Sequence, residues 1–194
     1  MNEKLETIID KPLGGLSLMI LLTTIWTLIG SFYIKHQDNF VLTIFFILVI
    51  FNFIYFYSKL HRLKKDLLKI IIEEDKKKER IYWIVLIAEG LSIPIAHTVL
   101  FNIHKEELFI SIFALIVGLH FFPLAKVFDR KFDYYIGTWT TLVALIGIVL
   151  TFRNVWTQDL INAFVCFGCA FATSSYGIRL IIEGNRLYKT TQKA

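Results

Sequence analysis

The sequence lacks the short motifs that mark the familiar enzyme and channel classes, and it holds only two cysteines. It contains no glycine-rich phosphate-binding loop, no His-Glu-x-x-His zinc helix, no Gly-x-Ser-x-Gly elbow and no selectivity-filter sequence. Both cysteines, Cys166 and Cys169, fall inside one apolar run, so they do not indicate the disulfide framework of a secreted domain. The familiar catalytic classes gain no support, and the sequence names no cofactor.

Charged residues are also scarce, and long polar segments are few. Only 19% of the 194 residues are charged, whereas 56% are hydrophobic, and the mean hydropathy is +0.60. A soluble domain of this size cannot bury that much apolar surface in one core, so lipid has to cover part of it. We therefore predict an integral membrane protein whose first partner is the lipid bilayer.

Six apolar runs are long enough to cross about 30 Å of hydrocarbon. Their expected spans are residues 13–34, 40–57, 81–103, 107–127, 132–152 and 159–182. Short polar breaks separate most of the runs, so neighbouring spans are expected to pair as hairpins. The first run is longer than a signal-peptide core and has no small-residue cleavage site, so it is expected to be retained. The fold class predicted is all-α, a single polytopic bundle of about six transmembrane helices over residues 1–194.

The distribution of basic residues predicts the orientation of the bundle. With both termini in the cytoplasm, 18 of the 21 lysines and arginines fall on the cytoplasmic side, which is the side that such residues prefer. Arg179, near the inner end of the last span, is expected to reach the lipid headgroups. The formal net charge of +5 alone suggests a nucleic-acid partner, but this one-sided distribution argues for a membrane and against nucleic acid.

The segment of residues 58–80 is predicted to be a charged cytoplasmic loop. Its apolar residues recur at helical spacing among lysines and arginines: Leu60, Leu63, Leu67, Ile70 and Ile71. A solvated helical loop that extends the second span is the favoured interpretation. Contact of residues 59–80 with anionic lipid or with a protein partner is the alternative, but Glu73, Glu74 and Asp75 dilute the basic charge.

Ionisable side chains inside a span are costly, so each is expected to face the bundle interior and to have a partner. Glu89 in the third span and His120 in the fourth lie at the same depth, roughly 10 to 12 Å from the cytoplasmic end. Neighbouring antiparallel helices can bring the two together. Other spans place polar residues in nearly the same layer: Asn52, Thr140, Thr141, Ser174 and Ser175.

This layer has two interpretations. As a substrate or proton site, a Glu–His pair changes protonation near neutral pH and couples proton movement to a conformational change. As structural contacts, Asn, Ser, Thr and neutral His hydrogen-bond between helices without chemistry. The functional interpretation is favoured for Glu89 and His120, and the structural one for the amide and the hydroxyls.

Pro94 and Pro123 fall inside spans close to this layer. A proline removes a backbone hydrogen bond and bends a helix, and broken helices often line transporter sites. There are two alternatives: ordinary membrane helices also tolerate proline, or the fourth helix ends early, at Pro123, where it reaches the cytoplasmic interface.

The Cys166-x-x-Cys169 spacing is used in redox proteins, and on a helix it places both sulfurs on one face. His97 lies at a similar depth and would complete a soft-metal site with them. Glycine and alanine surround the cysteines, however, and small residues of this kind favour close helix packing. Packing is the favoured interpretation.

The stretch from Gly118 to Ala125, which reads Gly-Leu-His-Phe-Phe-Pro-Leu-Ala, resembles a segment of small bacterial multi-span proteins. The resemblance implies a bacterial inner membrane and no particular activity. We expect a non-enzymatic function, transport or permeation of a proton or small solute around Glu89 and His120. Because six short helices are few for a complete transporter, a homo-oligomer is expected. An intramembrane enzyme acting on a lipid or quinone and a non-catalytic scaffold or sensor are the alternatives.

Overall fold

The computed structural model describes residues 3–6, 9–34, 41–64, 70–73 and 76–191, and in this part of the chain it is a bundle of long helices. Each expected span corresponds to one helix that is long and apolar enough to cross a membrane, which confirms the helical bundle. Residue 40, where the second span was expected to begin, lies outside the described residues. The helices are α1 (Asp10–Ile34), α2 (Val41–Lys64), α3 (Lys76–Asn102), α4 (Phe109–Phe128), α5 (Lys131–Arg153) and α6 (Gln158–Thr191), with a 3-10 turn, η1 (Glu106–Leu108), before α4.

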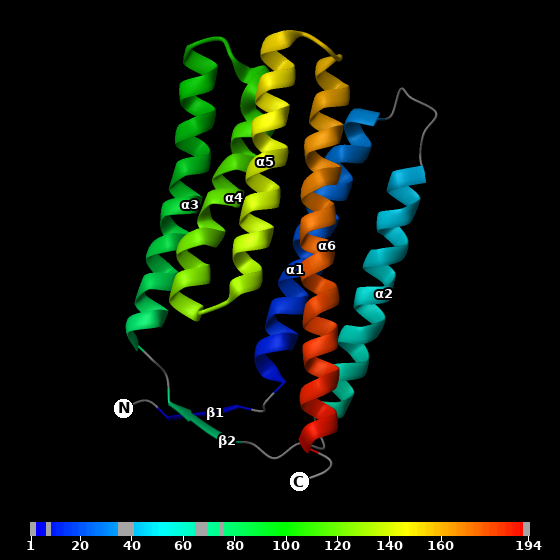
Figure 1. Ribbon diagram of the computed structural model, residues 1–194, viewed down its shortest axis with the longest axis vertical. Coiled ribbons are helices and arrows are strands. Elements are labelled where there is room, and N and C mark those ends of the chain that lie inside the picture. Colours follow the sequence, from blue (N-terminus) through cyan, green and yellow to red (C-terminus); the bar gives the residue numbers. More distant parts are fainter. Residues whose placement is uncertain (1–2, 7–8, 35–40, 65–69, 74–75, 192–194) are drawn as a thin grey trace.

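The helix α6 lies at the centre of the bundle (Figure 1). It packs most extensively against α1, and also against α5, α2 and α4. The helices α3, α4 and α5 form a second group in which α3 packs chiefly against α4. As a result α6 is mostly buried, whereas α2 and α3 turn most of their apolar surface outward. Lipid covers such faces in a membrane, so the outer helices fit the predicted bilayer environment.

The tight connections between helices use residues that tolerate a left-handed backbone. His104, Asp129 and Asn154 have φ values of 54°, 51° and 50°, and these residue types are enriched in that conformation. Asp129 and Asn154 end α4 and α5, and their backbone N–H groups bond carbonyls of the last turn. The polar breaks in the sequence therefore carry the turn chemistry that makes neighbouring spans antiparallel hairpins.

A short two-stranded ribbon accompanies the helical bundle and corrects the expectation that the segment of residues 58–80 is helical throughout. The strand β1 (Glu3–Glu6) pairs antiparallel with β2 (Ile70–Glu73), so that Ile70 and Ile71 lie in a strand. The run of three isoleucines is β-branched and favours a strand once a partner supplies the ladder hydrogen bonds. The partner strand, β1, lies near the N-terminus, so the spacing of residues within the loop does not reveal it.

The rest of the expected loop belongs largely to the flanking helices, because α2 continues to Lys64 and α3 begins at Lys76. The extension of the second span by a few residues is therefore confirmed, while residues 65–69 and 74–75 lie outside the described part. The ribbon and the end of α6 lie at the same end of the bundle (Figure 1). We call this the terminal end.

Candidate functional site

The structure brings Glu89 and His120 into contact across neighbouring helices. The distance from His120 Nδ1 to Glu89 Oε1 is 3.2 Å, and each side chain is 15% exposed. Nδ1 makes no well-directed hydrogen bond within the described residues, so the contact is a close approach of the two groups without ideal hydrogen-bond alignment. The imidazole also stacks on the ring of Phe121, with 4.3 Å between the ring centroids.

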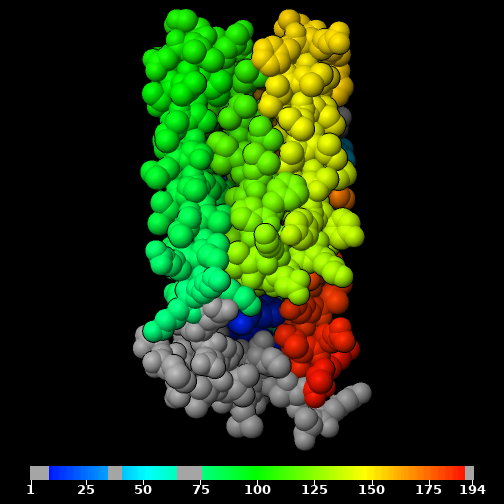
Figure 2. Space-filling model, turned by 60° about the vertical axis from the view of Figure 1, so that its left-hand side comes forward, coloured from blue at the N-terminus to red at the C-terminus, as the bar shows by residue number. Residues whose placement is uncertain are grey.

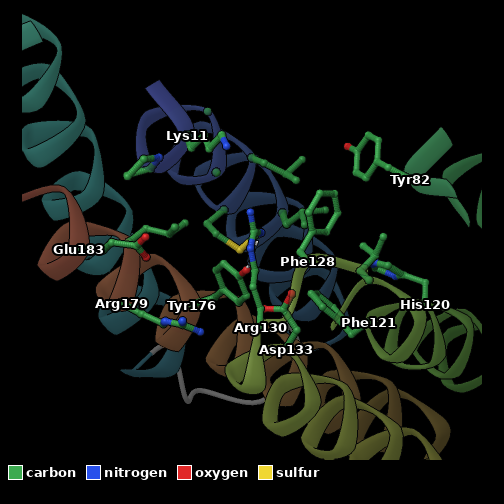
Figure 3. Close-up of a pocket in the computed structure, with 18 residues that line it drawn as sticks. Lys11, Tyr82, His120, Phe121, Phe128, Arg130, Asp133, Tyr176, Arg179 and Glu183 are labelled. Carbon is green, nitrogen blue, oxygen red and sulfur yellow. Dashed lines mark hydrogen bonds between the residues drawn. The ribbon is translucent and has the colours of Figure 1, made fainter. Parts of the chain in front are cut away.

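His120 lines a cavity of about 480 Å³ at the terminal end of the bundle. The first three turns of α1 form one wall, α4 forms the opposite wall, and the first turn of α5 and the part of α6 from residue 176 to residue 183 close the back (Figure 3). Figure 2 shows α1 exposed in a hollow below the foot of α4 and α5 and beside α6. The polar side chains that line the cavity are Lys11, Tyr82, His120, Arg130, Asp133, Tyr176, Arg179 and Glu183.

Asp133, Tyr176 and Arg130 form the centre of the polar wall (Figure 3). Asp133 is 2% exposed and lies in the first turn of α5, where the helix dipole favours a negative charge. Its carboxylate interacts with the hydroxyl of Tyr176, to which Arg130 Nη1 donates a hydrogen bond of 3.4 Å. Within the described residues, Asp133 Oδ1 is buried and accepts no hydrogen bond.

Arg179 completes this wall from α6. Its guanidinium carbon lies 4.7 Å from the centroid of the Phe132 ring, a cation–π contact. Nη1 is buried and makes no hydrogen bond to any residue that the structure describes. Arg179 was expected to reach the lipid headgroups, but its side chain lies against the cavity beside Tyr176 (Figure 3).

The other members of the expected polar layer lie outside the described lining of the cavity. Thr140 and Ser174 are buried, and Ser174 Oγ makes no hydrogen bond in the described part of the chain. Ser175 Oγ donates to the Phe171 carbonyl of its own helix at 2.9 Å, and Asn52 is exposed on α2. Equal depth therefore does not place these residues in one site, because they face different sides of their helices.

The two prolines interrupt neither helix. The helix α3 continues from Pro94 to Asn102, and the Pro94 carbonyl accepts a hydrogen bond of 2.9 Å from Thr98. The helix α4 continues past Pro123 to Phe128, so an early end at Pro123 is wrong. Both prolines are exposed on their helices, and the described cavity lining does not include them.

The cysteines and His97 lie apart. Cys166 and Cys169 are reduced and are buried in α6, where a Cβ on Gly30 of α1 would lie 3.1 Å from Cys166 Cβ. His97 is exposed on α3 and contacts the ring of Phe109 edge-on. In the described ranges no group of three or more His, Cys, Asp or Glu residues is arranged to hold a metal ion, so the three-residue metal site is not formed there. The contacts of the cysteines favour close helix packing.

Three residues of the cavity wall were not predicted from the sequence as site residues: Arg130, Asp133 and Tyr176. Arg130 and Asp133 lie at the ends of expected spans, where charged side chains are ordinarily solvated, and Tyr176 lies six residues inside the last expected span. One signal was present, because Asp133 falls one residue inside the fifth expected span and within three residues of Arg130. An acidic group at that position needs a partner or water.

Comparison with known proteins found no family model, no curated protein and no solved structure that matches the chain.

Proposed function

We propose that this chain is a multi-pass membrane protein that transports or conducts a proton or a small polar solute, with the terminal-end cavity as the access route. The observation that carries the proposal is the position of His120, which lines the cavity and also contacts Glu89 at 3.2 Å. A histidine on the wall of a cavity, in contact with a glutamate behind it, is the kind of arrangement that intramembrane proton relays use. The charges of the cavity draw polar species toward that pair.

The depth of His120 supports a path into the membrane. It precedes Phe128, the last residue of α4, by eight residues, and at 1.5 Å per residue this separation is roughly 12 Å. A proton that reaches the imidazole from the cavity can pass to Glu89, which lies beyond the described lining on α3. Because α3 packs chiefly against α4, movement of α3 is the simplest way to expose Glu89 to the opposite side.

The proposed setting is a bacterial inner membrane with both termini in the cytoplasm, so that the cavity opens to the cytoplasm. The bias of 18 of 21 basic residues toward that side supports this orientation. A homo-oligomer is proposed as the working form, since α2 and α3 present long apolar faces that a second copy can cover.

Proton flux in proteoliposomes tests the proposed function. Wild-type protein is expected to dissipate an imposed pH gradient, followed with an enclosed pH-sensitive dye, or to speed osmotic swelling in glycerol. The substitutions Glu89→Gln and His120→Gln keep size and remove the protonatable group, so each is expected to slow the responding flux at least tenfold. Glu79→Gln and His97→Gln are the matched controls, because both positions are exposed on α3 away from the cavity.

Fluxes of wild type that equal those of empty liposomes would overturn the transport proposal. Equal losses of flux in the two control variants would show that the substitutions act by destabilising α3 and not by removing the Glu89–His120 pair. Size-exclusion profiles of all four variants distinguish a folded, inactive protein from an aggregated one.

A further inference from the structure

The polar wall of the cavity holds two buried atoms of opposite character that lack hydrogen-bond partners in the described structure, Asp133 Oδ1 and Arg179 Nη1. One accepts hydrogen bonds and the other donates them. A buried charged atom without a partner is strongly destabilising, so native structures satisfy such atoms with water, an ion or a ligand. Both residues line the same cavity, on either side of Tyr176 (Figure 3).

The charges around these atoms are mixed. Lys11, Arg130 and Arg179 supply positive charge, whereas Asp133 and Glu183 supply negative charge. A simple anion would meet the repulsion of Asp133, and a simple cation would meet the arginines. An occupant that carries an anionic group and a protonated amine satisfies both, since the anionic oxygens bond the arginines and the amine donates to Asp133.

The remaining lining is apolar and opens toward the outside of the bundle. It consists of Leu18, Met19 and Leu22 on α1 and of Phe121, Leu124 and Phe128 on α4. Leu18 is 45% exposed, and a Cβ on Gly14 would meet no atom within 4 Å, so the α1 side of the cavity has free space. The apolar surface extends from the polar wall in the direction of the membrane interior, where the hydrocarbon part of an amphiphile can lie.

We propose that the cavity binds a zwitterionic ligand of the phosphoethanolamine type, with its primary ammonium at Asp133 and its phosphate at Arg130 and Arg179. The same chemistry occurs in a phosphatidylethanolamine headgroup and in the free solute. A volume of about 480 Å³ lies within the range of small-molecule pockets. Asp133 sets the preference for the amine, because a trimethylammonium group has no N–H to donate to Oδ1. His120 lines the same cavity, but the proposed contacts with the ligand involve neither His120 nor Glu89.

Binding by the detergent-solubilised full chain, measured by native mass spectrometry, tests the proposal. The protein is expected to bind phosphatidylethanolamine at least tenfold more tightly than phosphatidylcholine of the same acyl chains. Asp133→Asn is expected to remove that preference, and Arg179→Gln is expected to weaken binding at least tenfold. The controls Asp129→Asn and Arg186→Gln change exposed residues on the same end of the bundle and are expected to leave binding unchanged.

A second pair of variants keeps the test independent of the folding of Asp133→Asn. Gly14→Leu adds a side chain at a cavity-lining position where a Cβ would meet no atom within 4 Å, and Gly90→Leu adds the same side chain at a position on α3 where a Cβ is equally free. Only Gly14→Leu is expected to weaken binding, at least tenfold. Glu89→Gln is expected to bind as wild type does, so failure of the transport proposal and failure of the ligand proposal are separate results.

The source of the ligand is decided by adding free phosphoethanolamine to the same protein in a thermal unfolding measurement. A rise in the unfolding temperature that Asp133→Asn abolishes shows that the headgroup alone suffices, whereas binding of the lipid without such a rise assigns the site to the lipid. Equal binding of the two lipids by wild type, or an unchanged preference in Asp133→Asn together with unchanged binding by Gly14→Leu, overturns the proposal.

Discussion

Single hydroxyl groups in this bundle are mostly satisfied within their own helices. Thr24, Thr27 and Ser31 each donate to the backbone carbonyl four residues earlier, at distances of 2.6 to 2.7 Å. Hydroxyls satisfied in this way need no partner on another helix. Some hydroxyls also bond across helices: the Oγ1 atoms of Thr23 and Thr173 lie 2.8 Å apart and join α1 to α6, and Ser31 Oγ lies 2.9 Å from Thr43 Oγ1 of α2. A polar residue in a span is therefore weak evidence of a site until its partner is known.

The two thiols provide a test at the residue scale. Cys166 and Cys169 are 0% and 1% exposed, and a maleimide reagent needs an accessible thiolate. The folded protein is expected to label at least tenfold more slowly than the same protein unfolded in hot detergent. Fast labelling of either cysteine in the folded state would revive the redox interpretation. Replacing both cysteines with alanine is expected to leave flux and ligand binding unchanged.

Pairs of helices pack closely where a glycine removes the side chain between them. A Cβ on Gly118 of α4 would lie 2.6 Å from Thr141 Oγ1 and 2.8 Å from the Thr141 backbone nitrogen on α5. The backbone atom cannot move away without a shift of the helix. Glycine at this position therefore sets the distance between α4 and α5, and that distance places Asp133 near Phe121 at the cavity.

Gly118→Ala tests this contact at the element scale. The added methyl group is expected to lower the free energy of unfolding by about 1–3 kcal/mol, the usual cost of overpacking. Gly90→Ala is the control, because its Cβ would meet open space. Unfolding by a denaturing detergent measures both variants. Equal stabilities for the two would mean that α4 and α5 adjust their distance without cost.

The whole molecule has two groups of helices joined at α6, with the cavity between α1 of one group and α4 of the other. Farther from the terminal end the two groups are in contact, and there the rings of Trp26 and Phe113 lie 5.0 Å apart. The cavity thus results from the divergence of two helices that are distant in the sequence. Under the proposed function, a cavity that is open at this end gives access from one side of the membrane.

The orientation of the bundle is testable with single cysteines at the two ends of α5 in a chain whose native cysteines are alanine. Lys131→Cys and Arg153→Cys are both at exposed positions. A membrane-impermeant maleimide added to intact cells is expected to label Arg153→Cys and to label Lys131→Cys only after permeabilisation. The reverse pattern would turn the cavity toward the outside and contradict the cytoplasmic placement of the termini.

The sequence by itself determined the helical bundle, the positions of its helices and the close depth of Glu89 and His120. Hydrophobic run length and turn residues are local properties, so each run indicates a helix without knowledge of the others. His104, Asp129 and Asn154 adopt the left-handed backbone conformation that a tight connection needs. Because the connection between α3 and α4 is short, these two helices are neighbours.

Only the tertiary structure decided which polar residues share a site. Asp133, Tyr176 and Arg179 meet at the cavity because α5 and α6 turn those faces toward α1, whereas Thr140, Ser174 and Asn52 face elsewhere. Likewise the pairing of β1 with β2 joins segments more than 60 residues apart. The face that a helix presents depends on the packing of residues from distant parts of the chain, and hydropathy along one segment does not carry that information.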